Sequence, residues 1–268
     1  IPGGHFMKFL NKPFEVKNPD GLTIHGFEIA AQDGRNHDNA VILSHGFRAN
    51  MSYTRPYAEF LAQHGFYCFI FDFCGTWNGT SDGTFRDYMT PLTEVGDLKA
   101  VREIVEARKE FKTISLFGQS QGGFVSSLSA AWRPENVASL MLLFPAMCIP
   151  DNAREGAMQN YKFDPNNIPA HIGTPPMELS GEYARSVLHI DIFKEITGYH
   201  GPVLLEHGTA DPIVNISYAI KTEETYSSNG NYIQYYEYPG AGHGFTGHYV
   251  NESEEDMLRF LQAIHLAS

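Results

Sequence analysis

Short apolar runs alternate with longer amphipathic stretches along most of this chain. Short apolar runs bounded by turn residues are typical of buried strands, whereas apolar positions three and four residues apart predict helices. The predicted strands span residues 22–30, 40–44, 66–73, 113–117, 137–144, 202–206 and 232–238. The predicted helices span residues 56–64, 92–111, 121–132, 215–227 and 252–266. This alternation predicts an α/β fold with a mostly parallel central sheet and helices on both of its faces.

Residues 145–200 interrupt the alternation. The segment is too long for an ordinary connection, and its methionine and aromatic residues are interspersed with prolines and glycines. Long connections within compact domains are usually lids or binding elements. We therefore expect a single domain over residues 1–268, with a small cap inserted at residues 145–200. Apolar side chains of this cap would line a pocket, although for most of them packing against the main domain is sufficient explanation.

Composition and charge narrow the classes of function. The chain has 268 residues, of which 43% are hydrophobic, and this is ample for one large core. The formal net charge of -12 opposes binding to nucleic acid or to an anionic membrane surface. A small molecule is therefore the expected partner, and association into a homo-oligomer stays open.

The cysteines and the chain ends carry less information. Cys68, Cys74 and Cys148 are odd in number and not clustered, so they predict neither a disulfide framework nor a zinc site. We expect no metal and no organic cofactor. No signal peptide and no membrane-spanning run is visible, which favours a cytoplasmic protein. Residues 1–5 look like a cloning remnant, so loss of a native signal stays open.

The motif Gly-Gln-Ser-Gln-Gly at residues 118–122 joins a predicted strand to a predicted helix. In that context G-x-S-x-G forms a nucleophile elbow, a sharp turn that lifts the serine hydroxyl above the sheet edge. A Cβ at Gly118 or Gly122 would crowd the turn. By itself the motif also fits a small-residue turn with an incidental serine. Ser120 is thus a candidate nucleophile whose assignment depends on its partners.

A serine hydroxyl becomes a good nucleophile only when a histidine takes its proton and a third group orients that histidine. Asp211 follows the predicted strand at residues 202–206, and His243 lies in a glycine-flanked loop after the strand at residues 232–238. Asp211 could instead cap a turn, and His243 could be an ordinary loop residue. Because the order and context fit, we predict a triad of Ser120, Asp211 and His243.

Acyl transfer also needs two backbone N–H groups that hold an oxyanion. One is expected from Gln121, the residue after the nucleophile, and the other from Phe47, in the loop after the strand at residues 40–44. His45 lies close to this loop, but the base is expected last in chain order. We therefore interpret His45 as a structural residue.

Taken together, these motifs resemble the α/β-hydrolase superfamily along nearly the whole chain, and within it the bacterial cinnamoyl/feruloyl esterases. The matching stretches are residues 45–47, 71–73, 81–85, 118–123, 144–146, 163–169 and 207–211. Two departures lie near the expected site. The turn at residues 74–80 is longer than is usual in the family and carries Trp77, and Gln119 stands where histidine is common.

The resemblance implies an α/β-hydrolase fold and a serine carboxylic-ester hydrolase that works through an acyl-enzyme. It implies as substrates hydroxycinnamate esters, or other small aromatic or short-acyl esters. In these esterases a polar cap residue holds the phenolic hydroxyl, a role that we carry to Asn152 and Gln159. These two are seven residues apart, so one helix would place them on one face. Trp77 is a further candidate for substrate contact.

Other functions fit the same residues. A thioesterase, an acylglycerol lipase or a peptidase-like hydrolase could use the same triad. A non-catalytic protein of this fold that binds a small ligand is a further alternative, which an intact Ser-Asp-His set disfavours.

Overall fold

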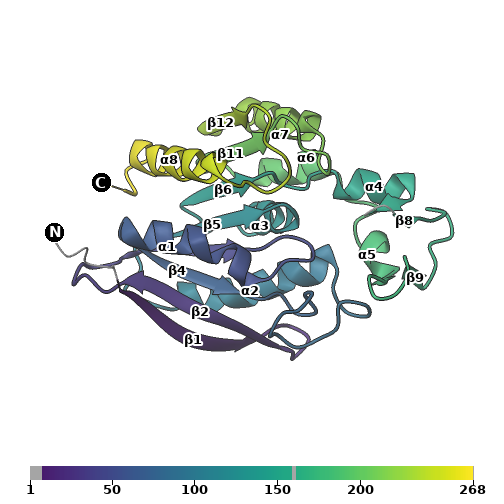
Figure 1. The fold of residues 1–268 in the computed structure, drawn as a ribbon, viewed down its shortest axis with the longest axis horizontal. Helices are drawn as coiled ribbons and strands as arrows, with labels where there is room; N and C mark the ends of the chain where they lie inside the picture. The colour runs from purple at the N-terminus through teal and green to yellow at the C-terminus, as the bar shows by residue number, and fades with distance from the viewer. Residues whose placement is uncertain (1–7, 159–160, 268) are drawn as a thin grey trace.

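An eight-stranded sheet forms the centre of the protein in the computed structural model, which describes residues 8–158 and 161–267 (Figure 1). The strand order is β1-β2-β4-β3-β5-β6-β11-β12. β1 and β2 pair antiparallel, as do β2 and β4, and the pairs from β4 to β12 are all parallel. The strands are β1 (Phe9–Lys17), β2 (Thr23–Ala31), β3 (Asn39–Ser44), β4 (Phe66–Phe71), β5 (Thr113–Gln119), β6 (Ser139–Leu143), β11 (Val203–Gly208) and β12 (Ile233–Tyr238). The predicted mostly parallel sheet is confirmed.

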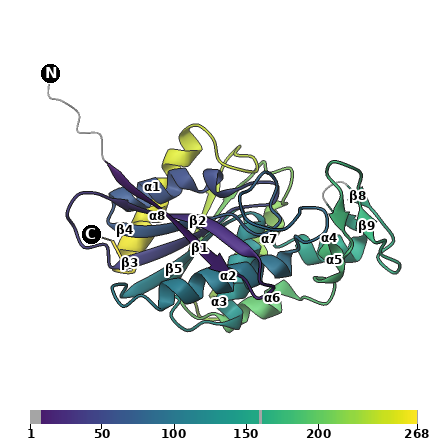
Figure 2. The ribbon, with the colours of Figure 1, turned by 90° about the horizontal axis from the view of Figure 1, so that it is seen from below.

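Helices cover both faces of the sheet, as Figure 2 shows. The principal helices are α1 (Arg55–Gln63), α2 (Pro91–Glu106), α3 (Gln121–Trp132), α7 (Ile216–Ser228) and α8 (His248–Ala263). α1 and α8 share one buried cluster, whereas α2, α3 and α7 belong to the other. The run in β3 illustrates why the strands read as continuously apolar. Val41 belongs to the cluster with α1 and α8, whereas Ile42 belongs to the cluster with α2, α3 and α7. Successive side chains of a strand point to opposite faces of the sheet, and here both faces are covered.

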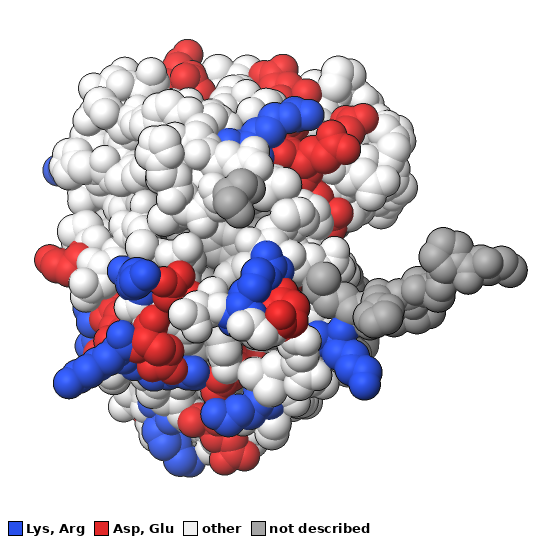
Figure 3. Space-filling view, turned by 90° about the vertical axis from the view of Figure 1, so that its left-hand side faces the viewer, with Lys and Arg blue, Asp and Glu red and all other residues white. Residues whose placement is uncertain are grey.

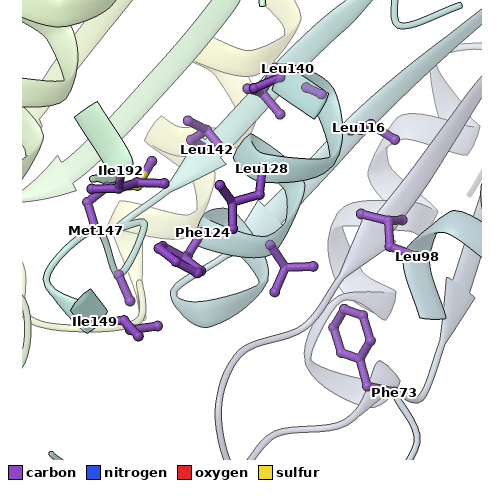
Figure 4. Packing of buried hydrophobic residues seen from close by; sticks show 14 of the residues in the cluster. Phe73, Leu98, Leu116, Phe124, Leu128, Leu140, Leu142, Met147, Ile149 and Ile192 are labelled. Atoms are coloured by element: carbon purple, nitrogen blue, oxygen red, sulfur yellow. The ribbon is translucent and has the colours of Figure 1, made fainter. Parts of the chain in front are cut away.

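The core on the α3 side continues from the sheet toward residues 145–200. Figure 4 shows Phe124 and Leu128 of α3 near Leu142 of β6, with Met147 and Ile149 extending the same cluster. Every one of these side chains is at most 3% exposed. The helix that begins directly after the candidate nucleophile Ser120 is therefore fixed by packing along its length.

Residues 145–200, here called the insertion, connect β6 to β11. Its elements are α4 (Ile149–Glu155), β7 (Ala157–Met158), β8 (Tyr161–Lys162), β9 (His171–Ile172), β10 (Leu179–Ser180), α5 (Glu182–Arg185), α6 (Ile192–Glu195) and the 3-10 turn η2 (Ile196–Gly198). Figure 1 shows α4, α5, β8 and β9 projecting from the end of the sheet that carries the carboxyl ends of the parallel strands. By contrast, α6 and η2 pack on α3. The insertion thus has a projecting part and a part that continues the ordinary strand-helix layering.

Arg154 joins the two chain segments at the base of the projecting part. Its guanidinium donates to the carbonyl oxygens of Leu188 and Ile190, both at 3.0 Å. The chain therefore leaves and rejoins the main body at nearly the same place.

The sequence did not predict β1, and it misplaced two helix ends. Pro13 lies within β1 and half of the strand is exposed, so its pattern was not that of a buried strand. An edge strand tolerates a proline because one row of its backbone groups has no partner strand. The helix predicted at residues 92–111 ends at Glu106, and the one predicted at residues 252–266 begins at His248. Otherwise the predicted elements are present with small shifts at their ends.

The opposite end of the molecule is rich in charges of both signs. Figure 3 shows Lys and Arg side chains interspersed with Asp and Glu over the lower half of this face. Near the amino ends of β3 and β5, Lys112 pairs with Asp38, and Arg35 pairs with Asp33. Exposed pairs of this kind contribute little to stability. Over the described ranges, no helix is long and apolar enough to cross a bilayer.

Candidate active site

Ser120 lies in a strained turn between β5 and α3. Its backbone angles are φ 51° and ψ -119°, a conformation that a non-glycine residue adopts at a cost on the order of 1–3 kcal/mol. Hydrogen bonds hold it there: the Ser120 N–H donates to the Leu143 carbonyl at 3.0 Å, and the Ser120 carbonyl accepts from Gly123 and Ala146, both at 2.9 Å. Such over-determined strain is characteristic of functional sites.

The glycines around Ser120 are required by close backbone contacts. A Cβ on Gly118 would lie 2.2 Å from the Gly122 carbonyl oxygen, and one on Gly122 would lie 2.4 Å from the carbonyl oxygens of Ser44 and His45. The crowding predicted for both positions is confirmed. Gly46, which the sequence did not single out, is also close, since its Cβ would lie 3.1 Å from the Cβ of Ser120.

The structure brings Ser120, His243 and Asp211 into one line of hydrogen bonds. The Nε2 atom of His243 lies 2.8 Å from the Ser120 hydroxyl oxygen, and its Nδ1 atom lies 2.7 Å from Oδ2 of Asp211. Asp211 follows β11 and His243 follows β12, so both reach the same edge of the sheet as the turn after β5. With Nδ1–H donating to the carboxylate, Nε2 is left to accept the serine proton.

The side chain of Asp211 is fully buried but remains an anion. Burial alone would raise the pKa of this carboxyl group. Hydrogen bonds from His243 and from the N–H groups of Val214 and Ile213, at 2.9 and 2.8 Å, outweigh that effect and hold the pKa below its ordinary value. The site therefore has a fixed negative charge beside the imidazole at neutral pH.

Two side chains next to the line of hydrogen bonds were missed by sequence reasoning. His207 donates from Nε2 to the Val214 carbonyl at 2.9 Å, and the same nitrogen lies 3.4 Å from Oδ2 of Asp211. Burial lowers the pKa of His207, which keeps it neutral. The ring of Phe144, in a backbone with φ 39°, meets the His243 ring edge-on at 5.0 Å. Both residues lie in stretches that carry the family resemblance, residues 144–146 and 207–211, but nothing in the sequence pattern assigns a role to either side chain.

The Phe47 and Gln121 N–H groups are available to a ligand. Neither N–H makes a hydrogen bond within the described part of the chain, and both residues line the cavity that contains Ser120. His45 is not placed to act as the catalytic base, because both of its ring nitrogens contact backbone groups. It is buried, with Nδ1 2.9 Å from the Gly46 carbonyl and Nε2 accepting the Phe73 N–H at 3.2 Å. Burial lowers the pKa of His45, so it braces the loop as a neutral ring.

A cavity of about 210 Å³ opens in front of Ser120. Residues of the insertion form one side of it and the loop after β11 forms another. Its lining consists of Phe47, Ser120, Gln121, Ala146, Cys148, Ile149, Asn152, Ala157, Met158, Tyr183, Pro212, Ile213 and Val214. Four of these residues, Phe47, Ser120, Gln121 and Asn152, are candidate site residues of the sequence. Three more, Ile149, Met158 and Tyr183, are among the apolar and aromatic residues of the insertion that the sequence expected to line a pocket.

The three predicted substrate contacts have different outcomes. Asn152 lines the cavity, with its amide nitrogen 3.5 Å from the Cys148 sulfur. Gln159 lies outside the described residues, and the single helix expected to carry both ends at Glu155, because Gly156 adopts φ 67°. Trp77 is not brought to the cavity: it packs on Phe85 with ring centroids 5.3 Å apart, and Phe85 in turn packs on Phe47. Within residues 8–158 and 161–267, no cluster of His, Cys, Asp and Glu could hold a metal ion.

Comparisons with known proteins identify the family of the chain and support its fold. Residues 35–169, just over half of the chain, match the family described as serine aminopeptidase, S33. The chain belongs to this family. Residues 188–261 of this S33 family member also match the dienelactone hydrolase family. The two matches together cover the strand ends that carry Ser120, Asp211 and His243.

Individual relatives support the same fold. Est1E from Butyrivibrio proteoclasticus, in a structure with bound ferulic acid, has a TM-score of 0.84 and 26% identity, covering 92% of this chain and 99% of its own. The Pyrococcus furiosus esterase Pf2001 has a TM-score of 0.72 and 21% identity, covering 95% and 93%. The predicted α/β-hydrolase fold is confirmed.

A curated relative matches only in part. Monoacylglycerol lipase ABHD6 from Mus musculus is 32% identical over 111 residues, which are 41% of this chain and 31% of that protein. The match thus spans less than a third of the relative's length.

Proposed function

We propose that this S33 family member is a serine carboxylic-ester hydrolase that works through an acyl-enzyme intermediate. The observation that carries the proposal is the continuous line from Asp211 through His243 to a strained Ser120 at the floor of a cavity. Family membership and the similarity to esterases support the reaction type.

The proposed reaction uses only groups of this chain and water. Ser120 Oγ attacks the ester carbonyl while His243 Nε2 takes its proton, and Asp211 stabilises the imidazolium that forms. The N–H groups of Phe47 and Gln121 hold the oxyanion. His243 then returns the proton to the leaving alcohol. Water, deprotonated by the same imidazole, attacks the acyl-serine, and the carboxylic acid leaves as Ser120 regains its proton.

The cavity favours a small acyl group. Its volume of about 210 Å³ lies below the range of about 300–1,000 Å³ that is typical of sites for drug-sized ligands. Apolar side chains such as Ile149 and Met158 would pack on the acyl chain, and Asn152 offers a polar contact in the lining of the same cavity. We propose hydroxycinnamate esters as the substrate class, supported by the ferulic acid bound to the similar Est1E.

A monoacylglycerol lipase is the second candidate. The partial match to ABHD6 favours it, whereas the small cavity opposes a long acyl chain. The S33 family description names an aminopeptidase, but no further observation favours a peptidase, and none favours a thioesterase.

A substrate panel tests the proposal. Methyl ferulate, methyl p-coumarate and methyl caffeate are compared with p-nitrophenyl acetate, a long-chain p-nitrophenyl ester and a monoacylglycerol. We expect kcat/KM for the hydroxycinnamates to exceed that for the long-chain esters by at least about tenfold, equivalent to roughly 1.4 kcal/mol in the activation free energy. Preference for the monoacylglycerol would favour the second candidate. Absence of hydrolysis and of fluorophosphonate labelling at Ser120 would contradict the reaction type.

Asn152→Ala is expected to alter substrate ranking. Loss of one hydrogen bond to a phenolic hydroxyl costs about 0.5–1.5 kcal/mol, so kcat/KM for hydroxycinnamates should fall several-fold to about tenfold relative to acetate esters. Asn166→Ala, an exposed amide elsewhere in the insertion, is the matched control and should leave the ratio unchanged. An equal loss on both ester classes would indicate a general structural role for Asn152, and no loss on either would place the phenolic end elsewhere.

A further inference from the structure

The side chain of Gln121 bridges the main domain and the insertion. It is 1% exposed, and its amide nitrogen donates to Oε2 of Glu94 on α2 at 2.9 Å. Its amide oxygen accepts a hydrogen bond from the hydroxyl of Tyr183 on α5. Each end of one buried amide is thus fixed by a different part of the molecule.

This side chain belongs to the residue whose backbone N–H faces the reaction. Gln121 is the first residue of α3, directly after Ser120, and its N–H has no acceptor within the described ranges. Hydrogen bonds from Gly123 and Ala146 to the Ser120 carbonyl already hold the Ser120–Gln121 peptide plane, and a side-chain amide held at both ends restricts its rotation further. Oxyanion donors act through fixed direction, and loss of one such donor costs roughly 10²–10³ in kcat.

Glu94 is buried in the main domain, on α2. It is 2% exposed, and burial raises the pKa of its carboxyl group well above the usual range; the Gln121 hydrogen bond opposes this and neighbouring Asp97 adds to it. Asp97 is itself fixed by the Asn18 amide and the Cys74 N–H, both at 2.7 Å. A neutral Glu94 needs no counter-ion, so it can accept from the Gln121 amide while it is buried.

Tyr183 contacts both residues that supply the oxyanion donors. Besides its hydroxyl bond to Gln121, its ring meets the Phe47 ring edge-on with centroids 5.7 Å apart. We propose that Tyr183 and Glu94 are positioning residues that set the oxyanion donors, with the Gln121 amide linking the insertion to the reaction centre. This inference rests on the proposed function. By it, the insertion affects kcat through the oxyanion donors and does not act on substrate choice alone.

The test compares Tyr183→Phe with Tyr218→Phe. Tyr218 on α7 also donates its hydroxyl to a residue of the insertion, Asp151 at 2.8 Å, but neither of these two residues belongs to the oxyanion donors. The substrate is p-nitrophenyl acetate, whose acyl group is too short to depend on distant insertion contacts. We expect Tyr183→Phe to lower kcat on the order of tenfold with KM within about twofold, and Tyr218→Phe to change neither.

Glu94 variants supply the second arm. Glu94→Gln keeps a carbonyl acceptor for the Gln121 amide and should retain most activity, whereas Glu94→Leu should lose at least as much kcat as Tyr183→Phe. A boronic acid that forms a tetrahedral adduct with Ser120 should lose affinity in proportion to the fall in kcat/KM. Equal losses in Glu94→Gln and Glu94→Leu, or a Tyr183→Phe defect confined to KM, would overturn the proposal.

An activity-independent measurement separates this inference from the proposed function. The backbone amide of Gln121 is followed by NMR in the same variants. It should shift in Tyr183→Phe and Glu94→Leu but not in Tyr218→Phe, whether or not any ester is hydrolysed. An unmoved Gln121 amide contradicts the positioning role, whereas a moved amide in a protein that hydrolyses no ester contradicts the proposed function alone.

Discussion

Ser120→Ala and His243→Ala, made separately, are each expected to lower kcat for ester hydrolysis by roughly 10⁴–10⁶ while the protein stays folded. The alanine at position 120 has no oxygen to attack the ester, and the alanine at position 243 leaves the serine proton without an acceptor 2.8 Å away. Initial rates on p-nitrophenyl acetate measure the loss, and thermal melting reports folding.

His248→Ala is the control for these variants, because His248 is an exposed imidazole a few residues from His243. It should keep full activity. The double variant Ser120→Ala, His243→Ala should be no worse than either single variant, since the two groups act as one unit. The expected loss of roughly 10⁴–10⁶ leaves far less than one per cent of the wild-type kcat. If Ser120→Ala kept more than about one per cent, Ser120 could not be the nucleophile.

Asp211→Asn is expected to lower kcat by about 10⁴ with little change in KM. An asparagine can present its NH₂ group to Nδ1 of His243, which favours the tautomer with the proton on Nε2, and that tautomer cannot accept the Ser120 proton. The variant also removes the negative charge that stabilises the imidazolium. Stopped assays at neutral pH, where the lowered pKa of Asp211 keeps the wild-type carboxylate ionised, measure the effect.

Asp256→Asn is the matched control for a buried carboxylate. Asp256 accepts a hydrogen bond from the Tyr238 hydroxyl at 2.9 Å. Tyr238 belongs to the core cluster with α1 and α8, and neither residue lines the cavity. The Asp256→Asn variant should lose stability but keep kcat. If Asp211→Asn stayed as active as this control, another acid would have to orient His243.

The sequence predicted the triad because its constraints are local. Gly118 and Gly122 are required by atoms of the turn itself, and Asp211 and His243 each follow a strand that its own apolar pattern identifies. The edge strand β1 was missed for the opposite reason: it is half exposed and interrupted by Pro13, so no local pattern marks it.

The positioning roles of Glu94 and Tyr183 could not be predicted from local pattern. A glutamate in the first turn of an amphipathic helix is usually a solvated charge, and only the packing of α2 against α3 buries this one. Tyr183 lies in a segment of short elements with no period that places its side chain. Contacts between distant segments, here 62 residues apart for Tyr183 and Gln121, depend on the whole fold.

The narrow base of the insertion has a consequence for evolution and for protein engineering. Because Arg154 ties residues 188 and 190 to the end of α4, the projecting part begins and ends at one point and leaves the register of β6 and β11 untouched. Doubling the length of such an excursion costs only about 0.6 kcal/mol in closure entropy. We therefore expect changes in the length of the projecting part to leave the sheet intact, provided that its buried side chains still complete the core and a hydroxyl donor still reaches Gln121.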